Sequence, residues 1–160
     1  MEELKKVKRL AEFIRTEPEK FRELANSSPY YRLLGMELVE CRKGFARFRL
    51  PHKEQLMQLA GVVHGGAIAS IADSAGAMAT IATAENCTSV ATAEMKLNFI
   101  APASGNDLFA EGRIVHCGST LAVADVEVKD SDGVLVAKAL ATYVLISNDR
   151  PDSAGLGIQQ

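Results

Sequence analysis

The sequence predicts an α+β domain in which a curved antiparallel sheet wraps around one long central helix, preceded by an N-terminal helical extension. Three observations predict this class. Apolar residues near the amino terminus recur at helical spacing, the stretch Gly65–Ala84 is alanine-rich and long enough for a buried helix, and most of the remainder alternates apolar with polar residues. An antiparallel sheet with its helices gathered on one face is the α+β arrangement that buries such a helix.

The length of 160 residues suits one packed core. We expect residues 1–29 to form the helical extension and residues 30–146 to form the domain. Residues 147–160 are polar and contain one proline and two glycines, so we expect a mobile tail there.

Two helices and a short turn are expected before the first strand. Residues 2–15 carry one apolar stripe, which predicts a surface helix. A second helix is expected to begin with Thr16 as its cap and Pro18 in its first turn. The stretch 26–29 ends that helix, and residues 30–34 form one more turn.

Strand patterns flank the long helix on both sides. The first two strands, at residues 36–38 and 46–50, are joined around Gly44, and a loop over residues 51–63 leads to the helix. Four further strands are predicted at residues 91–99, 107–117, 120–129 and 134–146, with a hairpin turn at 130–133. In the first of these four, Ala93 is expected to keep the apolar phase while Thr92, Glu94 and Lys96 share the polar face.

Composition excludes several classes of protein. A formal charge of -2 and a pI near 5.9 argue against a nucleic-acid partner, since phosphate-backbone binding needs a basic surface. No apolar run is long enough to span a bilayer and the amino terminus is charged, so we expect a cytoplasmic protein without membrane association. Cys41, Cys87 and Cys117 are widely spaced, which suggests neither disulfides nor a metal site.

The first candidate site is the pair Gly65–Gly66 at the expected start of the long helix. Glycine permits close approach of a ligand to the backbone, and the free amides at a helix start face an oxygen at the positive end of the helix dipole. Such donors stabilise the oxyanion formed in acyl transfer. Glycine pairs also occur at helix starts for turn geometry alone, so this feature indicates a site only together with a second observation.

Asp73 is the second candidate, because it is the only ionisable residue between Gly65 and Ala84. It lies well past the first turn, where neither capping nor the helix dipole explains it. At ~100° per residue it sits roughly 140° from Ile68, away from the apolar stripe of the helix. A helix face that simply reaches solvent would also accommodate it.

Gly65 and Asp73 are eight residues apart, about 12 Å along a helix, which is too far for both to touch one carbonyl carbon. If both act, they come from different subunits. Antiparallel pairing of the helix with its copy across a two-fold axis would bring Gly65 of one chain beside Asp73 of the other. We therefore expect a homodimer with shared active sites. Its assembly into a homotetramer is a further expectation that does not follow from this spacing.

These residues resemble a known family. The set Gln58, Gly61, His64-Gly65-Gly66, Asp73 and the strand Thr92–Phe99 leading into Pro102 is similar to that of the hotdog-fold acyl-CoA thioesterases of the phenylacetic acid degradation type. The resemblance covers about residues 30–146. It implies hydrolysis of an aryl- or medium-chain acyl-CoA thioester to the free acid and coenzyme A, with no cofactor and no metal beyond the substrate.

The resemblance also implies roles for individual residues. The Gly65 amide polarises the thioester carbonyl with His64 shaping the turn, Asp73 is nucleophile or general base, and Gln58 and Thr92 hold the attacking water or the carboxylate. Gly66, Val63 and Ala77 are expected to contact the substrate. Ala77 departs from relatives that carry a hydroxyl there, which leaves the support of the Asp73 carboxylate open.

Two other functions remain open. The hotdog fold also hosts acyl-thioester hydratases and dehydratases, which use a histidine and an acid, and fold alone does not decide function. A non-catalytic acyl-CoA-binding module would keep the groove without needing Asp73. For His64 itself we favour a ring that hydrogen-bonds backbone over a general base, and Arg113 and Lys138 are undistinguished candidates for contacting the coenzyme A phosphates.

Overall fold

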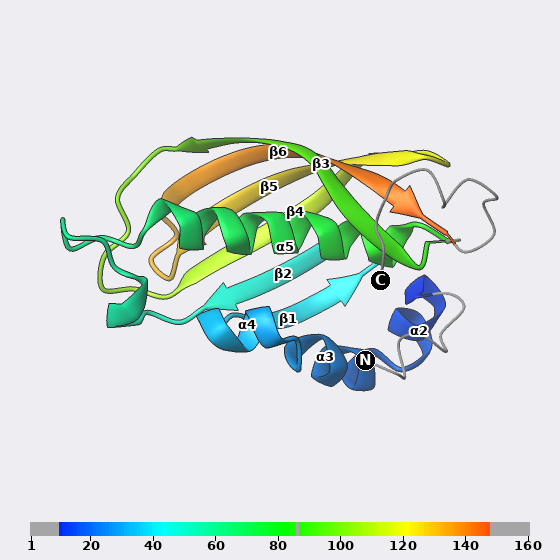
Figure 1. Cartoon of the computed structure of the whole chain (residues 1–160), viewed down its shortest axis with the longest axis horizontal. Coiled ribbons are helices and arrows are strands. Elements are labelled where there is room, and N and C mark those ends of the chain that lie inside the picture. The colour runs from blue at the N-terminus through cyan, green and yellow to red at the C-terminus, as the bar shows by residue number, and fades with distance from the viewer. Residues whose placement is uncertain (1–9, 86, 148–160) are drawn as a thin grey trace.

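A computed structural model describes residues 10–85 and 87–147. Within these residues, a six-stranded antiparallel sheet curves around the long helix α5 (Gly65–Thr83), and three short helices lie beside the first strand of the sheet (Figure 1). The predicted α+β architecture is confirmed. The parts of the expected first helix before residue 10, and the expected tail after residue 147, lie outside the described residues.

The helical extension is α2 (Leu10–Thr16), α3 (Pro18–Asn26) and the short α4 (Pro29–Leu34). Its apolar side chains join the main core, since Leu10, Ile14 and Phe21 are buried in the same cluster as the apolar face of α5.

The predicted Thr16 cap was wrong. Thr16 is the last residue of α2 and its hydroxyl donates to the Glu12 carbonyl at 3.1 Å. Glu17 occupies the cap position of α3 without a side-chain cap hydrogen bond. Pro18 opens the helix without an N–H, so one fewer donor there needs a cap.

The sheet order is β1-β2-β4-β5-β6-β3, which puts β1 and β3 at the edges. The strands are β1 (Glu37–Arg42), β2 (Phe45–Leu50), β3 (Ser89–Phe99), β4 (Leu108–Cys117), β5 (Leu121–Asp130) and β6 (Leu135–Ile146). Gly44 and Gly133 close two hairpins at positive φ, where glycine has no Cβ to clash. All six strands were predicted, with boundaries that differ by only a few residues.

Small residues let α5 approach the sheet closely. A Cβ added at Gly112 of β4 would stand 2.4 Å from the Ala75 carbonyl oxygen, and one added at Gly76 would meet the Tyr143 hydroxyl at 2.2 Å. Both distances are far inside normal contact, so a larger residue at Gly112 would have to displace the backbone of α5, and one at Gly76 would have to displace the Tyr143 side chain or the helix. Small residues on both sides therefore allow the close approach of α5 to the sheet.

A β-bulge in β3 decides which side chains face α5. Thr92 pairs with Tyr143 and Glu94 pairs with Thr142, which leaves Ala93 as the extra residue. The bulge inverts the alternation, so Thr92 lies on the same face as Met95 and Leu97. The prediction that Thr92 shares the outer face with Glu94 and Lys96 was wrong, because a strict period of two cannot show a bulge.

Among the described residues, no helix is both long and apolar enough to cross a membrane. The three cysteines are free thiols. Burial raises the pKa of Cys41 to about 12, with the neighbouring Glu40 carboxylate adding to the shift, so this thiol stays protonated at neutral pH.

Candidate active site

The start of α5 presents one amide with no acceptor. His64 is the N-cap, and its Nδ1 accepts a hydrogen bond from the Gly66 amide at 2.9 Å. The next two helical amides donate to the His64 carbonyl. Among the described residues nothing accepts from the Gly65 amide, which leaves one donor at the positive end of a 19-residue helix.

The loop before α5 is tied to the body of the fold by backbone hydrogen bonds. The Val63 amide donates to Ala103 and the His64 amide donates to Leu56, both at 2.8 Å. A tight turn at residues 58–61, with Gly61 at φ 75°, brings Gln58 back beside Val62. These contacts fix the position of the helix start and of its free amide.

A cleft of about 420 Å³ opens at this end of the molecule. Gln58, Val63 and Gly65 line it from one side, and Phe99 lines it from the end of β3. Phe99 is 58% exposed, and its ring would stand 3.1 Å from a Cβ placed on Gly65. The structure thus brings three of the predicted residues to one cleft, and Asp73 does not line it.

Asp73 is half-buried on α5, and two hydroxyl groups hold it. The Thr92 hydroxyl donates to Oδ1 at 2.8 Å, and the Tyr143 hydroxyl donates to the Asp73 carbonyl at 3.0 Å and lies 3.4 Å from Oδ1. Among the described residues none donates to Oδ2. One carboxylate oxygen is therefore held in place by hydroxyl groups, while the other accepts no hydrogen bond from the described residues.

Tyr143 is the residue that the sequence reading missed. It is fully buried on β6 and pairs directly with Thr92. Burial, together with the Asp73 charge, raises the pKa of its phenol, so it remains a neutral donor. A signal existed, because Tyr143 is the one large polar residue in a row of inward-facing alanines, and a buried tyrosine hydroxyl needs a partner.

Tyr31 of α4 reaches the same place from the helical extension. Burial raises the pKa of its phenol, and the Asp73 charge adds to this, while a hydrogen bond with Ser74 acts in the opposite direction. Its ring packs edge-on against Phe48 with centroids 5.2 Å apart. Asp73 and Ser74 therefore lie against a phenol that the sequence pattern did not single out.

The partly exposed residues of α5 form one stripe along the helix. Its members up to Ala77 are Gly66, Ala69, Ser70, Asp73 and Ala77, and Ile81 continues the stripe toward the end of the helix. The carboxylate lies in the middle of the stripe, and the other members before Ile81 have small side chains. Thr92 and Tyr143 supply the support that Ala77, lacking a hydroxyl, does not.

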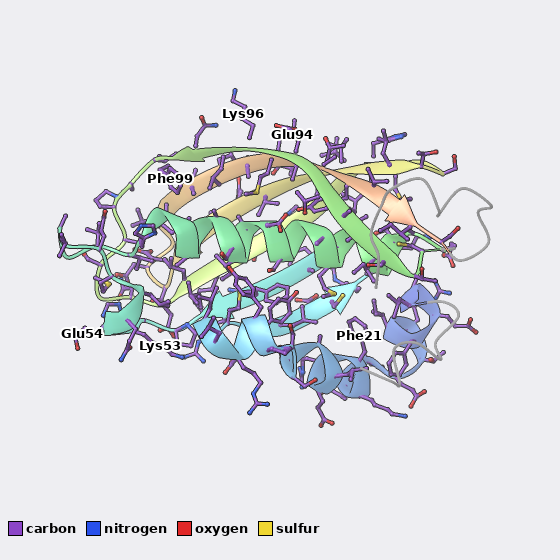
Figure 2. All side chains as sticks on the ribbon, viewed as in Figure 1. Phe21, Lys53, Glu54, Glu94, Lys96 and Phe99 are labelled. Atoms are coloured by element: carbon purple, nitrogen blue, oxygen red, sulfur yellow. The ribbon has the colours of Figure 1, made fainter. Side chains whose placement is uncertain are left out.

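Other candidates lie elsewhere. Figure 2 shows Glu94 and Lys96 projecting from β3 away from α5. Arg113 is paired with Glu111, and Lys138 with Asp125. Arg113 and Lys138, the candidates for contacting the coenzyme A phosphates, alternate with inward-facing residues of their strands. Within one chain they therefore lie on the face of the sheet opposite α5. Across residues 10–85 and 87–147 no cluster of three or more His, Cys, Asp or Glu could hold a metal ion.

Comparison with known proteins identifies the family. The family model described as the thioesterase superfamily matches residues 60–137. A protein of Saccharolobus solfataricus whose name calls it a putative esterase is 34% identical over 116 residues, covering 72% of this chain and 82% of that protein. The medium/long-chain acyl-CoA thioesterase YigI of Escherichia coli is 28% identical over 134 residues, covering 73% and 85%.

Solved structures agree with this result. A thioesterase family protein from Silicibacter pomeroyi superposes with a TM-score of 0.74 at 28% identity, covering 81% of this chain and 98% of that one. The protein smu.793 from Streptococcus mutans, solved bound to acetyl CoA, has a TM-score of 0.65 at 26% identity, covering 70% and 89%. This chain belongs to the thioesterase superfamily, and its fold is the hotdog fold that the sequence predicted.

Proposed function

We propose that this protein hydrolyses an acyl-CoA thioester at a site that combines Asp73 of one chain with the start of α5 of a second chain. The observation that carries the proposal is the pairing of Asp73 with Thr92. This hydrogen bond orients a carboxylate whose second oxygen is free, on the exposed stripe of a helix that otherwise has only apolar and small polar side chains. The similarity to YigI supports acyl-CoA as the substrate class.

The free amide of Gly65 suits the thioester carbonyl oxygen. As the carbonyl carbon becomes tetrahedral its oxygen gains negative charge, and a preformed backbone donor at the positive end of a helix stabilises that charge. His64 keeps the turn in place by accepting from Gly66, so Gly65 alone is left to donate.

The spacing along α5 requires two copies of the chain. Gly65 and Asp73 are eight residues apart on one straight helix, about 12 Å at 1.5 Å per residue. Two copies of α5 packed antiparallel through the small-residue stripe would place each Gly65 near the other chain's Asp73. The edge strand β3, which lies beside α5 and carries the exposed Phe99, supports an isologous contact at this face.

Hydrolysis then needs few groups. Asp73 Oδ2 takes a proton from a water molecule as the water oxygen bonds to the acyl carbon, and the Gly65 amide holds the oxyanion. Collapse of the tetrahedral intermediate breaks the carbon–sulfur bond, and the proton on Asp73 passes to the departing thiolate. Gln58 lines the same cleft as Gly65 and would orient the water. Attack by Asp73 itself, through an anhydride that water hydrolyses, would use the same groups.

A hydratase mechanism would need a histidine free to exchange protons with the substrate. The Nδ1 of His64 is occupied by the Gly66 amide, as we expected for a ring that hydrogen-bonds backbone. This contact explains the presence of His64 by the structure of the turn. The proposed mechanism therefore uses the Asp73 carboxylate and the Gly65 amide and does not need His64 as an acid or base.

The test is hydrolysis by the purified protein with a panel of aryl- and straight-chain acyl-CoA esters, using a thiol reagent to detect free coenzyme A. Asp73→Asn keeps the size of the side chain and an oxygen for the Thr92 hydroxyl, so the oligomer should remain intact while turnover falls by 10³-fold or more. Asp125→Asn, a change at a carboxylate on the outer face of the sheet, is the matched control. Full turnover by Asp73→Asn would overturn the proposal, as would thiol release from none of the esters by the wild type.

A further inference from the structure

Tyr143 presents a buried hydroxyl to both the backbone and the side chain of Asp73. The tyrosine is 0% exposed, and its hydroxyl lies 3.0 Å from the Asp73 carbonyl oxygen and 3.4 Å from Oδ1. Its neighbours on the same face of β6, Ala139 and Ala141, are small and apolar. Burying a hydroxyl is unfavourable unless it is hydrogen-bonded, so the contact with Asp73 is what makes this side chain acceptable here.

The long helix leaves room for this hydroxyl at Gly76. A Cβ added to Gly76 would have the Tyr143 hydroxyl oxygen as its nearest neighbour, at 2.2 Å. The residues on either side, Ala75 and Ala77, are both alanine. Glycine is less favourable than alanine inside a helix, so the helix keeps an unfavourable residue at the position that faces the hydroxyl.

Two strands deliver hydroxyl groups to the same carboxylate oxygen. Thr92 of β3 pairs directly with Tyr143 of β6, and its hydroxyl donates to Asp73 Oδ1 at 2.8 Å. Both contacts to the carboxylate are made at Oδ1. The terminal torsion of an aspartate has a broad, two-fold distribution, so contacts of this kind rather than rotamer preference decide where Oδ2 points.

We propose that Tyr143 is a positioning residue of the active site and that Gly76 is present to admit its hydroxyl. The inference rests on the proposed function. The hydroxyl acts through Asp73, because it holds the backbone and Oδ1 of that residue and so limits the directions in which Oδ2 can meet the attacking water. Its loss should therefore lower kcat and leave KM unchanged.

The experiment compares the steady-state kinetics of Tyr143→Phe with those of the wild type, using the acyl-CoA ester that the wild type hydrolyses fastest. Phenylalanine keeps the ring and removes only the hydroxyl. We expect kcat to fall about tenfold, the lower end of the contribution of a hydrogen bond to a charged group, because the 3.4 Å contact is long. KM should stay within about twofold of the wild-type value.

Tyr30→Phe controls for the loss of a phenol hydroxyl that bonds the same helix elsewhere. The Tyr30 hydroxyl lies 2.7 Å from the Ser70 hydroxyl of α5, and Tyr30 is 50% exposed. This variant should keep kcat within about twofold of the wild type. Thermal unfolding of both variants shows whether each is folded at the assay temperature.

Gly76→Ala tests the same contact from the side of the helix. In the wild-type background the added Cβ displaces the Tyr143 hydroxyl, so we expect a loss in kcat of about tenfold, like that of Tyr143→Phe. In the Tyr143→Phe background the hydroxyl is already absent, and the nearest ring carbon, 3.0 Å from the Cβ, needs to give by only a few tenths of an ångström. The double variant should therefore stay within about threefold of Tyr143→Phe alone.

The outcomes separate this inference from the function on which it rests. A kcat of folded Tyr143→Phe equal to that of Tyr30→Phe would overturn the positioning role, whatever the change in stability, and would leave the proposed function standing. A higher KM at unchanged kcat would do the same. Losses that multiply in the double variant would overturn the link between Gly76 and the hydroxyl. Absence of thiol release by the wild type from every ester would overturn both the inference and the proposed function.

Discussion

Replacing Gly65 by proline should remove one hydrogen-bond donor and almost nothing else. Gly65 is the first residue of α5, where proline is well tolerated because its missing N–H has no helical acceptor. The preceding residue, His64, has φ -63° and ψ 135°, the extended conformation that a following proline requires. The helix should therefore form in Gly65→Pro, with the thermal unfolding midpoint close to that of the wild type.

The expected loss of activity follows from the chemistry of one oxyanion donor. Removing a single such donor costs about 10² to 10³ in kcat, or about 3 to 4 kcal/mol. Gly65→Ala is the matched control, because it adds a similar Cβ against the exposed Phe99 ring yet keeps the amide. We expect Gly65→Ala to stay within about threefold of the wild type in steady-state thiol release. A kcat for Gly65→Pro within threefold of that for Gly65→Ala would refute the assignment of this amide.

Three further predictions concern the carboxylate, the packing and the pH dependence. Thr92→Val should lower kcat/KM by about 10- to 100-fold, since a hydrogen bond to a charged group contributes about 1.5 to 3 kcal/mol, while Thr92→Ser keeps most of the activity. Gly112→Ala should cost about 2 to 3 kcal/mol in urea unfolding, because its Cβ meets helix backbone, whereas Gly118→Ala, facing a flexible side chain, should cost under about 1 kcal/mol; equal losses would contradict the close approach of α5. Hydrogen bonds from two lysines lower the pKa of Glu127 to about 2, so its stabilisation is present above its ordinary pKa of 4.5 and is lost as the pH falls toward 2. The difference in unfolding free energy between wild type and Glu127→Gln should be under about 1 kcal/mol at pH 6 and smaller at pH 3; a constant difference would argue against the ion pairs.

The fold could be predicted because its elements have clear local patterns. The long alanine-rich segment from Gly65 has no competing interpretation, and the strands after it alternate cleanly. The small residues of the long helix also predicted that a curved sheet could wrap closely around it. That Gly112 is the residue where β4 meets α5 depends on strand pairing, which the sequence does not show. The Thr16 cap could not be settled locally, because the same hydroxyl can bond backward within the preceding helix.

The residues of the candidate site could be selected from the sequence only where a residue type is unusual in its surroundings. Asp73 and Gly65 stand out in the sequence because of what surrounds them. Tyr143 is also unusual among its alanine neighbours, but its partner could not be identified from the sequence, because Asp73 lies 70 residues away and the contact depends on the order of β6 and β3 in the sheet. The orientation of Thr92 depends on a single extra residue, Ala93, and no periodicity reveals a bulge.

The shared site is tested most directly by mixing two inactive variants. Asp73→Asn and Gly65→Pro chains, combined in equal amounts under conditions of proven subunit exchange, form hybrid dimers in half of the cases. Each hybrid has one site with an intact carboxylate from one chain and an intact amide from the other, so we predict recovery of roughly one quarter of wild-type turnover. Turnover no higher than the average of the two separate variants, with hybrids present, would show that each chain builds its own site and would contradict the account.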